Sequence, residues 1–301
     1  MTTTESLAVD GVISETRSRT TVVGSAAGRH RAGAGDGEHA AYRLTLGRVL
    51  RSEWIKLRSL RGTWLGLGAV LVVMVGIGVI AAAVSINRVA SGGGGGPRAE
   101  GPLATVLLGA NFGVLLLGVI GCLAGAREYA SRMITATVAA VPRRWPVVFG
   151  KATVLGAVVL PVALVGVFGA FFLGMATLSR GGAATVALSG SGVLRSIIGM
   201  ALYLTAIALL GLGLGIIMRS AAASIGTLIG GVIILPGIAG ALLPASWSEI
   251  LKYLPTNAAA SFTSVTPPAT DLSAGAGAVV LIAWVVLALG AAIVAIRRRD
   301  V

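Results

Sequence analysis

Glu53 is the acidic residue whose position most clearly suggests chemistry, because it stands among cations just before the first long apolar run. Six basic residues surround it: Arg43, Arg48, Arg51, Lys56, Arg58 and Arg61. In a helix that starts at Leu46, Glu53 would lie near the middle of an apolar face. A buried carboxylate is costly unless a partner compensates it. Glu53 should therefore bond a basic residue of the segment Arg127–Lys151, face a protein contact, or reach water beside Lys56.

The helix that would carry Glu53 spans residues 44–61 and is amphipathic. At about 100° per residue, the residues on its apolar face are Leu46, Val49, Leu50, Trp54, Leu57, Leu60 and Trp64. Arg48, Arg51 and Arg58 fall on the other face. This pattern predicts a helix on the membrane surface, with Trp54 and Trp64 at interface depth and the arginines toward anionic lipid. The alternative is a run of charges that only fixes the orientation of the first span.

The segment Arg127–Lys151 is the second place where charged residues gather. Its sequence predicts a short helix that Ser131 caps and Pro142 ends, with Arg143 and Arg144 directly after it. The apolar side of this helix would be formed by Met133, Ile134, Val138 and Val141. Such a helix between two apolar runs could serve as a lever on which a soluble partner pushes. The alternative is an ordinary interfacial loop.

Histidine and cysteine, which could act in catalysis or bind a metal, are scarce in this chain. His30 and His39 both lie in the polar N-terminal stretch, and Cys122 is the only cysteine, which we expect to be a small buried hydrophobe. The stretch "WPVVFGKAT" (Trp145–Thr153) ends like a phosphate-binding loop, but it lacks the first glycine and the Ser or Thr after the lysine. We therefore expect no catalytic residue, metal or cofactor, and no enzyme activity in this chain.

Six apolar runs must position the charged residues. The chain has 301 residues, of which 55% are hydrophobic and only 12% charged, and its mean hydropathy is +0.92. A soluble domain is not so apolar, and each run is long enough to cross a membrane as a helix. The predicted spans are residues 64–86, 103–126, 152–178, 193–218, 221–243 and 275–296. The sequence thus predicts an all-α polytopic membrane protein, with a transmembrane domain at 41–301 and a disordered tail at 1–40.

The distribution of Lys and Arg predicts the orientation. Of the 24 basic residues, 15 fall at one set of alternate span ends and 5 at the other set. The rule that positive charge stays inside places the richer side, and both termini, in the cytoplasm of a multi-pass plasma-membrane protein. The net charge of +13 then reflects topology and anionic lipid, so we expect no nucleic-acid partner.

The segments between the spans, together with Pro161 and Pro236, predict how the spans are connected and where they bend. Only Arg219–Ser220 joins the fourth and fifth spans, so these should form a tight hairpin. Pro161 is expected to kink or tilt the third span, and Pro236 to break the fifth near its outer end. The outer segment 244–271 is too short to span, although it has apolar residues at helical spacing. It should lie at the outer interface or dip in and return, with Trp247 and Tyr253 at headgroup depth.

Glycines four residues apart occur in several spans and allow close helix approach. The pairs are Gly109/Gly113, Gly121/Gly125, Gly211/Gly215 and Gly226/Gly230. Any one pair is a weak signal in a chain with 44 glycines.

No Asp, Glu, Lys or Arg falls in the interior of any predicted span. An ion-coupled carrier usually needs such a group as its relay or ion site. If the protein moves a substrate, the energy should therefore come from outside the chain.

The sequence resembles the type-two ABC transporter permeases, especially compact actinobacterial members. The resemblance rests on "LRSEWIKLRSLRGTW", "REYASRMITATVAAVPRR", "GLGLGIIMRSAAASIG" and "LKYLPTNAA". It covers residues 44–299, while the polar tail and the "GGGGGP" outer loop depart from the pattern.

This resemblance implies a six-span subunit that dimerises with itself or a second permease and pairs with cytoplasmic ATPase subunits. It implies that residues 127–151 carry a coupling helix on the ATPase, with Glu128 and Arg132 in its entry motif and Glu53 facing a contact nearby. Arg143 and Arg144 complete the predicted coupling set. The outer segment before the last span would form a re-entrant pair.

The sequence therefore leads us to expect an ATP-driven exporter of an amphipathic or lipid-like compound or drug. The alternative is a membrane anchor or assembly factor that recruits a cytoplasmic partner without transport.

Overall fold

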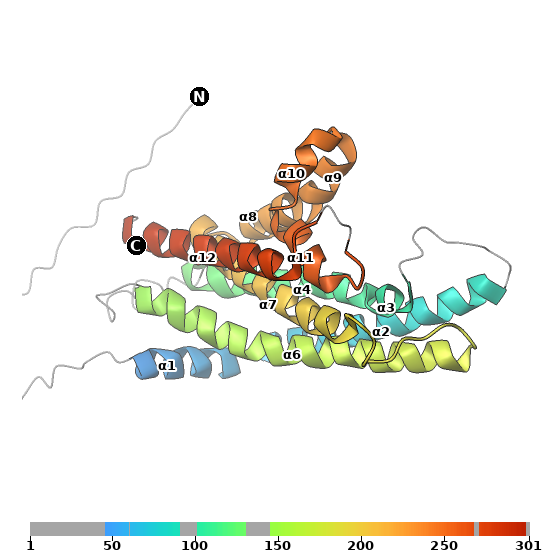
Figure 1. The fold of residues 1–301 in the computed structure, drawn as a ribbon. Helices are drawn as coiled ribbons and strands as arrows, with labels where there is room; N and C mark the ends of the chain where they lie inside the picture. The colour runs from blue at the N-terminus through green and yellow to red at the C-terminus, as the bar shows by residue number, and fades with distance from the viewer. Residues whose placement is uncertain (1–45, 60, 91–100, 131–144, 268–270, 299–301) are drawn as a thin grey trace, which may run out of the picture. The chain divides into compact units, whose positions relative to one another are not determined.

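The structure is a computed structural model that describes residues 46–59, 61–90, 101–130, 145–267 and 271–298. The described residues form helices joined by turns and irregular connections, with no strand among them. Six helical segments in this part of the chain are long and apolar enough to cross a membrane. The predicted all-α polytopic fold is thereby confirmed (Figure 1).

The first three spans keep their predicted places but are longer than expected. Helix α1 (Leu46–Ser59) is followed by α2 (Arg61–Ala90), and the second span is split into α3 (Gly101–Val106) and α4 (Leu108–Ala130). Helix α6 (Trp145–Arg180) starts seven residues before the predicted 152, because Pro146 stands in the first turn, where a proline is tolerated, and no later residue up to Lys151 breaks the helix. Pro161 lies within α6, and the helix continues through it.

The last three spans are α7 (Val193–Met218), the composite α8 (Ala221–Gly226), η1 (Thr227–Ile234) and α9 (Leu235–Leu242), and α12 (Ala274–Arg298). The predicted bounds of the fourth span agree with α7. The predicted tight hairpin is confirmed, because only Arg219 and Ser220 separate α7 from α8. Ser220 caps α8 by accepting a hydrogen bond from the amide of Ala223.

The prediction that Pro236 breaks the fifth span is wrong. The helical run continues to Leu242, but the turns just before the proline widen into the π-helix η1. A proline has no N–H for the carbonyl four residues earlier, which here belongs to Val232. The hydroxyl of Thr256 donates to this carbonyl at 2.7 Å, so the freed acceptor is satisfied from another segment, as a membrane interior requires.

The centre of the fold is the crossing of α4 and α7, where glycines bring two backbones together. A Cβ on Gly121 would lie 2.0 Å from the carbonyl oxygen of Ala208, and one on Gly215 would lie 2.4 Å from that of Cys122. The pair Gly109/Gly113 serves a similar contact with α2 at Met74. Only the fourth predicted pair, Gly226/Gly230, faces open space.

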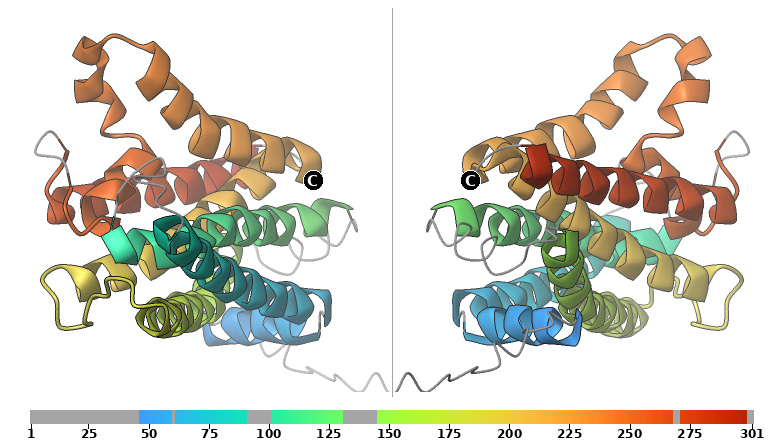
Figure 2. Two further views of the ribbon diagram at one scale, coloured as in Figure 1. Left: turned by 90° about the vertical axis from the view of Figure 1, so that its right-hand side faces the viewer. Right: turned by 90° about the vertical axis from the view of Figure 1, so that its left-hand side faces the viewer.

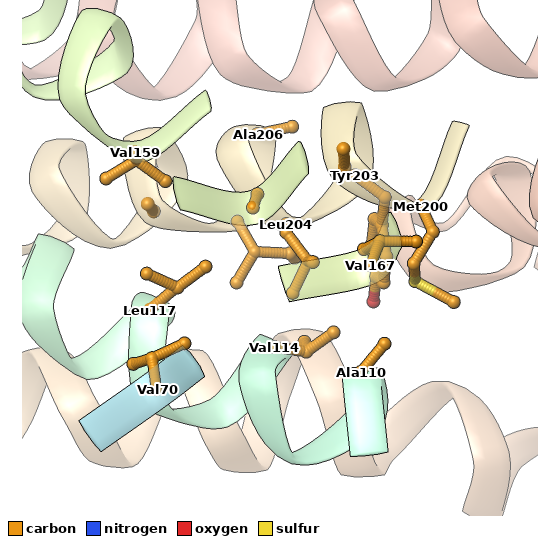
Figure 3. Packing of buried hydrophobic residues seen from close by; sticks show 14 of the residues in the cluster. Val70, Ala110, Val114, Leu117, Val159, Val167, Met200, Tyr203, Leu204 and Ala206 are labelled. Carbon is orange, nitrogen blue, oxygen red and sulfur yellow. The ribbon is translucent and has the colours of Figure 1, made fainter. Parts of the chain in front are cut away.

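Buried hydrophobic side chains fill the space around this crossing (Figure 3). The labelled residues come from four spans: Val70 from α2; Ala110, Val114 and Leu117 from α4; Val159 and Val167 from α6; and Met200, Tyr203, Leu204 and Ala206 from α7. The thiol of Cys122 is buried in the same core, as expected. Helix α7 is accordingly the most buried span, with 67% of its apolar window inside the protein.

The spans at the edge of this core keep large apolar surfaces exposed. In the fifth span only 11% of the apolar window is buried, and in α12 only 17%. Figure 2 shows α8, η1 and α9 slanting away from the other helices. A lipid-exposed apolar surface of this kind is ordinary in a membrane, where it costs nothing.

The described part of the predicted outer segment contains three short helical pieces. They are η2 (Ala245–Trp247), α10 (Ser248–Leu251) and α11 (Pro255–Thr263). Helix α11 packs against α7 and α12 and buries Ala258, Ala259, Ser261 and Phe262. The indole of Trp284 on α12 donates to the carbonyl oxygen of Tyr253 at 2.9 Å. The segment therefore turns back into the bundle, while Trp247 and Tyr253 stay exposed.

Candidate functional site at the basic end of the bundle

The span ends that are rich in Lys and Arg meet at one end of the bundle. The guanidinium of Arg127, near the end of α4, lies 3.4 Å from the hydroxyl of Thr63, near the start of α2. Arg219, after α7, places its guanidinium 5.0 Å from the centre of the Tyr129 ring. The first contact joins the end of the second span to the start of the first, and the second contact joins it to the start of the fifth. The alternating distribution of Lys and Arg predicts that these span ends lie on the same side.

Glu53 forms a buried ion triad with two lysines at this end. One carboxylate oxygen of Glu53 lies 2.7 Å from Nζ of Lys56, and the other lies 2.9 Å from Nζ of Lys151. The Glu53 side chain is only 6% exposed. Two cations on one carboxylate offset the cost of removing that charge from water. Of the alternatives for Glu53, the structure therefore shows pairing with a basic residue of the segment Arg127–Lys151, together with Lys56.

A small residue on α6 allows this pairing. Gly150 lies under α1, and a Cβ added to it would be 2.8 Å from Cγ1 of Val49. Val49 and Glu53 are the two buried residues of α1, one helical turn apart. Close packing of α1 on the first turns of α6 therefore brings the Glu53 carboxylate to Lys151, the residue directly after Gly150.

The apolar face predicted for α1 is divided between the contact with α6 and the protein surface. Val49 is buried and Leu50 and Leu57 are half-buried, whereas Trp54 remains 42% exposed. Arg48, Arg51 and Arg58 are exposed on α1, and so is Trp64 on α2. The five residues predicted to anchor the protein to the membrane are thus all at the surface. The contact face of α1 with α6 centres on Val49 and Glu53.

A cavity of about 550 Å³ opens between α1, α2, α4 and α6 beside the ion triad. Its charged lining consists of Glu53, Lys56, Arg127 and Lys151. The rest of its lining is small or apolar: Leu57, Ser59, Gly62, Thr63, Gly66, Ile120, Leu123, Ala124, Val154 and Leu155. The cavity therefore combines a basic rim with a hydrocarbon wall.

The hairpin after α7 begins with a residue in the left-handed backbone conformation, Arg219. This residue has φ of 55°, and it is the only non-glycine residue of the described chain in the left-handed region. Its amide donates to the carbonyl oxygen of Gly215 and ends the helix. The Arg219 guanidinium lies over the Tyr129 ring, so the hairpin contacts the end of α4.

Most of the predicted coupling set lies outside the described residues. Arg132, Arg143 and Arg144 belong to the segment 131–144, and of Glu128 only the backbone, in the last turn of α4, is described. The predicted coupling helix and the tail at 1–40 also fall outside the described ranges. Only the surroundings of Glu53 can be compared with the prediction, and its coupling role stays a prediction.

Three charged residues of the cavity, Lys56, Arg127 and Lys151, were not predicted as site residues. The signal for Lys151 was present, because a carboxylate inside an apolar stripe demands a cation. Among the described residues, no group of three or more His, Cys, Asp or Glu side chains could hold a metal ion. In the described membrane-spanning helices, Asp, Glu, Lys and Arg lie within the first two or the last two turns, and Lys151, in the second turn of α6, is the one furthest from a helix end.

No protein-family model matches the chain, and the comparison with curated proteins finds no match either.

Proposed function

We propose that this membrane protein is the permease subunit of an ATP-driven ABC transporter that exports an amphipathic or lipid-like compound or drug. The resemblance of residues 44–299 to type-two permeases suggests the class. The observation that carries the proposal is the ion triad, which ties α1 to α6 at the end where the cationic residues gather. In this proposal a cytoplasmic ATPase docks at that end.

The ion triad gives the proposed docking end a mechanical route into the membrane. The segment 131–144 leads directly into α6, so a force on it acts on the start of α6. Lys151 passes that force to α1 through the Glu53 carboxylate, and α6 passes it to α2 and α7, against which it packs. The spans carry charged residues only near their ends, so they lack the intramembrane group that an ion-driven carrier would use.

The proposed transporter works as a dimer of this chain or with a second permease. The low burial of the fifth span and of α12 leaves apolar surface on which the second subunit would pack, in place of lipid. Transport would then follow ATP-driven closure of two ATPase subunits against the cytoplasmic face of the dimer.

The test begins with purification of the tagged full-length chain from its native membranes. We expect an ATPase subunit to copurify, and vesicles containing the pair to transport an amphipathic substrate only when ATP is present. Replacement of Glu128 by Ala should reduce substrate-stimulated ATP hydrolysis at least about tenfold while membrane insertion stays normal. A tenfold loss of rate corresponds to an increase of about 1.4 kcal/mol in the activation free energy.

Glu249 provides the matched control, because it is an exposed glutamate at the opposite end of the bundle. Glu249→Ala should hydrolyse ATP like the wild type. A partner that binds but supports no transport would instead favour the anchor function. Transport driven by an ion gradient in vesicles without ATP would contradict the proposal.

A further inference from the structure

We propose that the cavity between α1, α2, α4 and α6 binds an anionic phospholipid. The lipid phosphate would lie among Lys56, Arg127 and Lys151, and part of an acyl chain would follow the apolar wall. This inference does not depend on the proposed transport activity, because it rests on the shape and charge of the cavity.

The size of the cavity is that of a ligand site. A volume of about 550 Å³ lies within the range of 300 to 1,000 Å³ that is typical of small-molecule pockets. Water is a poor occupant for most of this space, since buried water needs several polar partners and Ile120, Leu123, Val154 and Leu155 offer none. An occupant must therefore bring apolar groups of its own.

The charge of the lining selects an anion. Three cationic side chains and one carboxylate line the cavity, so the cations exceed the acids. The carboxylate of Glu53 accepts from both lysines, which directs its charge toward them. Guanidinium and ammonium groups bind phosphate oxygens through charge-assisted hydrogen bonds. A neutral apolar ligand would offer these cationic side chains no acceptor, whereas a phosphate offers several.

The depth of the cavity suits a lipid rather than a soluble anion. Its lining comes from the first turns of α2 and α6, the last turns of α4, and α1, so it lies at one end of the membrane-spanning helices. Basic pockets between transmembrane helices at this depth are typical sites for anionic headgroups. The polar headgroup would lie at the rim and the chain would run inward along Val154 and Leu155.

Binding can be measured on the purified full-length chain by native mass spectrometry in a mild detergent. Three probes separate the sources of the phosphate: phosphatidylglycerol, phosphatidylcholine with the same acyl chains, and glycerol phosphate. We expect phosphatidylglycerol to bind at least about tenfold more tightly than phosphatidylcholine, and glycerol phosphate to show no retained binding. Equal retention of the two lipids would overturn the anion preference. Binding of glycerol phosphate as tightly as the lipid would overturn the role of the apolar wall.

Two pairs of variants place the lipid in the cavity. Arg127→Gln removes a rim cation and should weaken phosphatidylglycerol binding about fivefold, the effect expected for one basic residue near anionic lipid. Arg61→Gln removes the same charge outside the lining and should bind like the wild type. Equal weakening by both would show that only the net charge matters and would contradict the site.

The second pair fills the cavity. Gly62 lines it, and a Cβ there would meet no atom within 4 Å, so Gly62→Phe should exclude the lipid without displacing the backbone. Gly68 also faces open space but lies outside the lining, so Gly68→Phe should retain binding. Circular dichroism and elution volume establish that each variant is folded. Normal binding by a folded Gly62→Phe protein would overturn the proposal, and if that variant does not fold, the arginine pair decides alone.

Discussion

At the residue scale, Glu53 determines how α1 is held. Its carboxylate is bonded by one lysine on its own helix and by another on α6. Lys56 alone could keep the charge solvated, as it is the more exposed partner, at 34%. Lys151 contributes something different, because it connects two segments that are almost a hundred residues apart in the sequence.

We predict that Lys151→Met destabilises the protein by about 1–3 kcal/mol. Loss of one partner from a buried pair costs about 3–5 kcal/mol, and the remaining bond from Lys56 reduces that figure. The measurement is thermal unfolding in detergent. Glu53→Gln combined with Lys151→Met should recover part of the loss, because no carboxylate is then left with a missing partner. Strictly additive effects in this double-mutant cycle would mean that the two residues do not interact.

The partner of Glu53 could be predicted from the sequence only in part. The apolar stripe around Glu53 was enough to predict that it needs a cation or a protein contact. It did not single out Lys151, because that choice depends on Gly150 letting α1 approach α6. A glycine that matters for packing looks the same in sequence as the glycines at 226 and 230, which face open space.

At the element scale, the fifth span shows how a helix keeps its course through a proline. The π-helix η1 precedes Pro236, and the Thr256 hydroxyl satisfies the carbonyl of Val232 at 2.7 Å. The hydroxyl of Tyr203 lies 3.4 Å from Thr256 and donates to it. Three elements, α7, η1 and α11, are thus joined through one threonine side chain.

We predict that Thr256→Val destabilises this junction by about 0.5–1.5 kcal/mol, because the Val232 carbonyl and the Tyr203 hydroxyl both lose a partner in an apolar environment. Thr256→Ser keeps the hydroxyl and should lose much less stability. Hydrogen exchange of the amides in 227–242 should increase in the valine variant only. Equal exchange in both variants would show that the hydroxyl does not stabilise the span.

The apolar runs predicted the existence and order of all six spans, because a hydrocarbon thickness sets a minimum helix length. They did not predict the ends of α6, the split between α3 and α4, or η1. Helices continue past the apolar run wherever no residue stops them, and a π-turn depends on partners far away in the chain. These features arise from tertiary contacts that hydrophobicity does not encode.

At the scale of the whole molecule, the charge asymmetry between the two ends is built into the fold. Arg127, Lys151 and Arg219 lie at one end, whereas Arg195 lies at the other, where its guanidinium donates to the carbonyl oxygens of Ser264 and Val265. The positive-inside rule then predicts which end faces the cytoplasm.

We predict that the basic end is cytoplasmic. Single cysteines introduced at Ser59 and Ser246, in a Cys122→Ala background, place one exposed thiol near each end. A membrane-impermeant maleimide should label the Ser246→Cys protein in intact cells and the Ser59→Cys protein only after lysis. The Cys122→Ala parent serves as the unlabelled control. The reverse labelling pattern would invert the protein and remove the cytoplasmic docking end from the proposed mechanism.

The length of α6 has a consequence for how the helix can move in a membrane. Its 36 residues form a rod of about 54 Å, which exceeds a hydrocarbon thickness of about 30 Å. The rod therefore protrudes from the hydrocarbon layer or tilts strongly. If it rotated by about 10° around one end, the other end would move by about 9 Å. Pro161 removes one backbone bond near the middle of the rod. The two halves can thus bend separately, so that an angular change at Trp145 need not reach Arg180 in full.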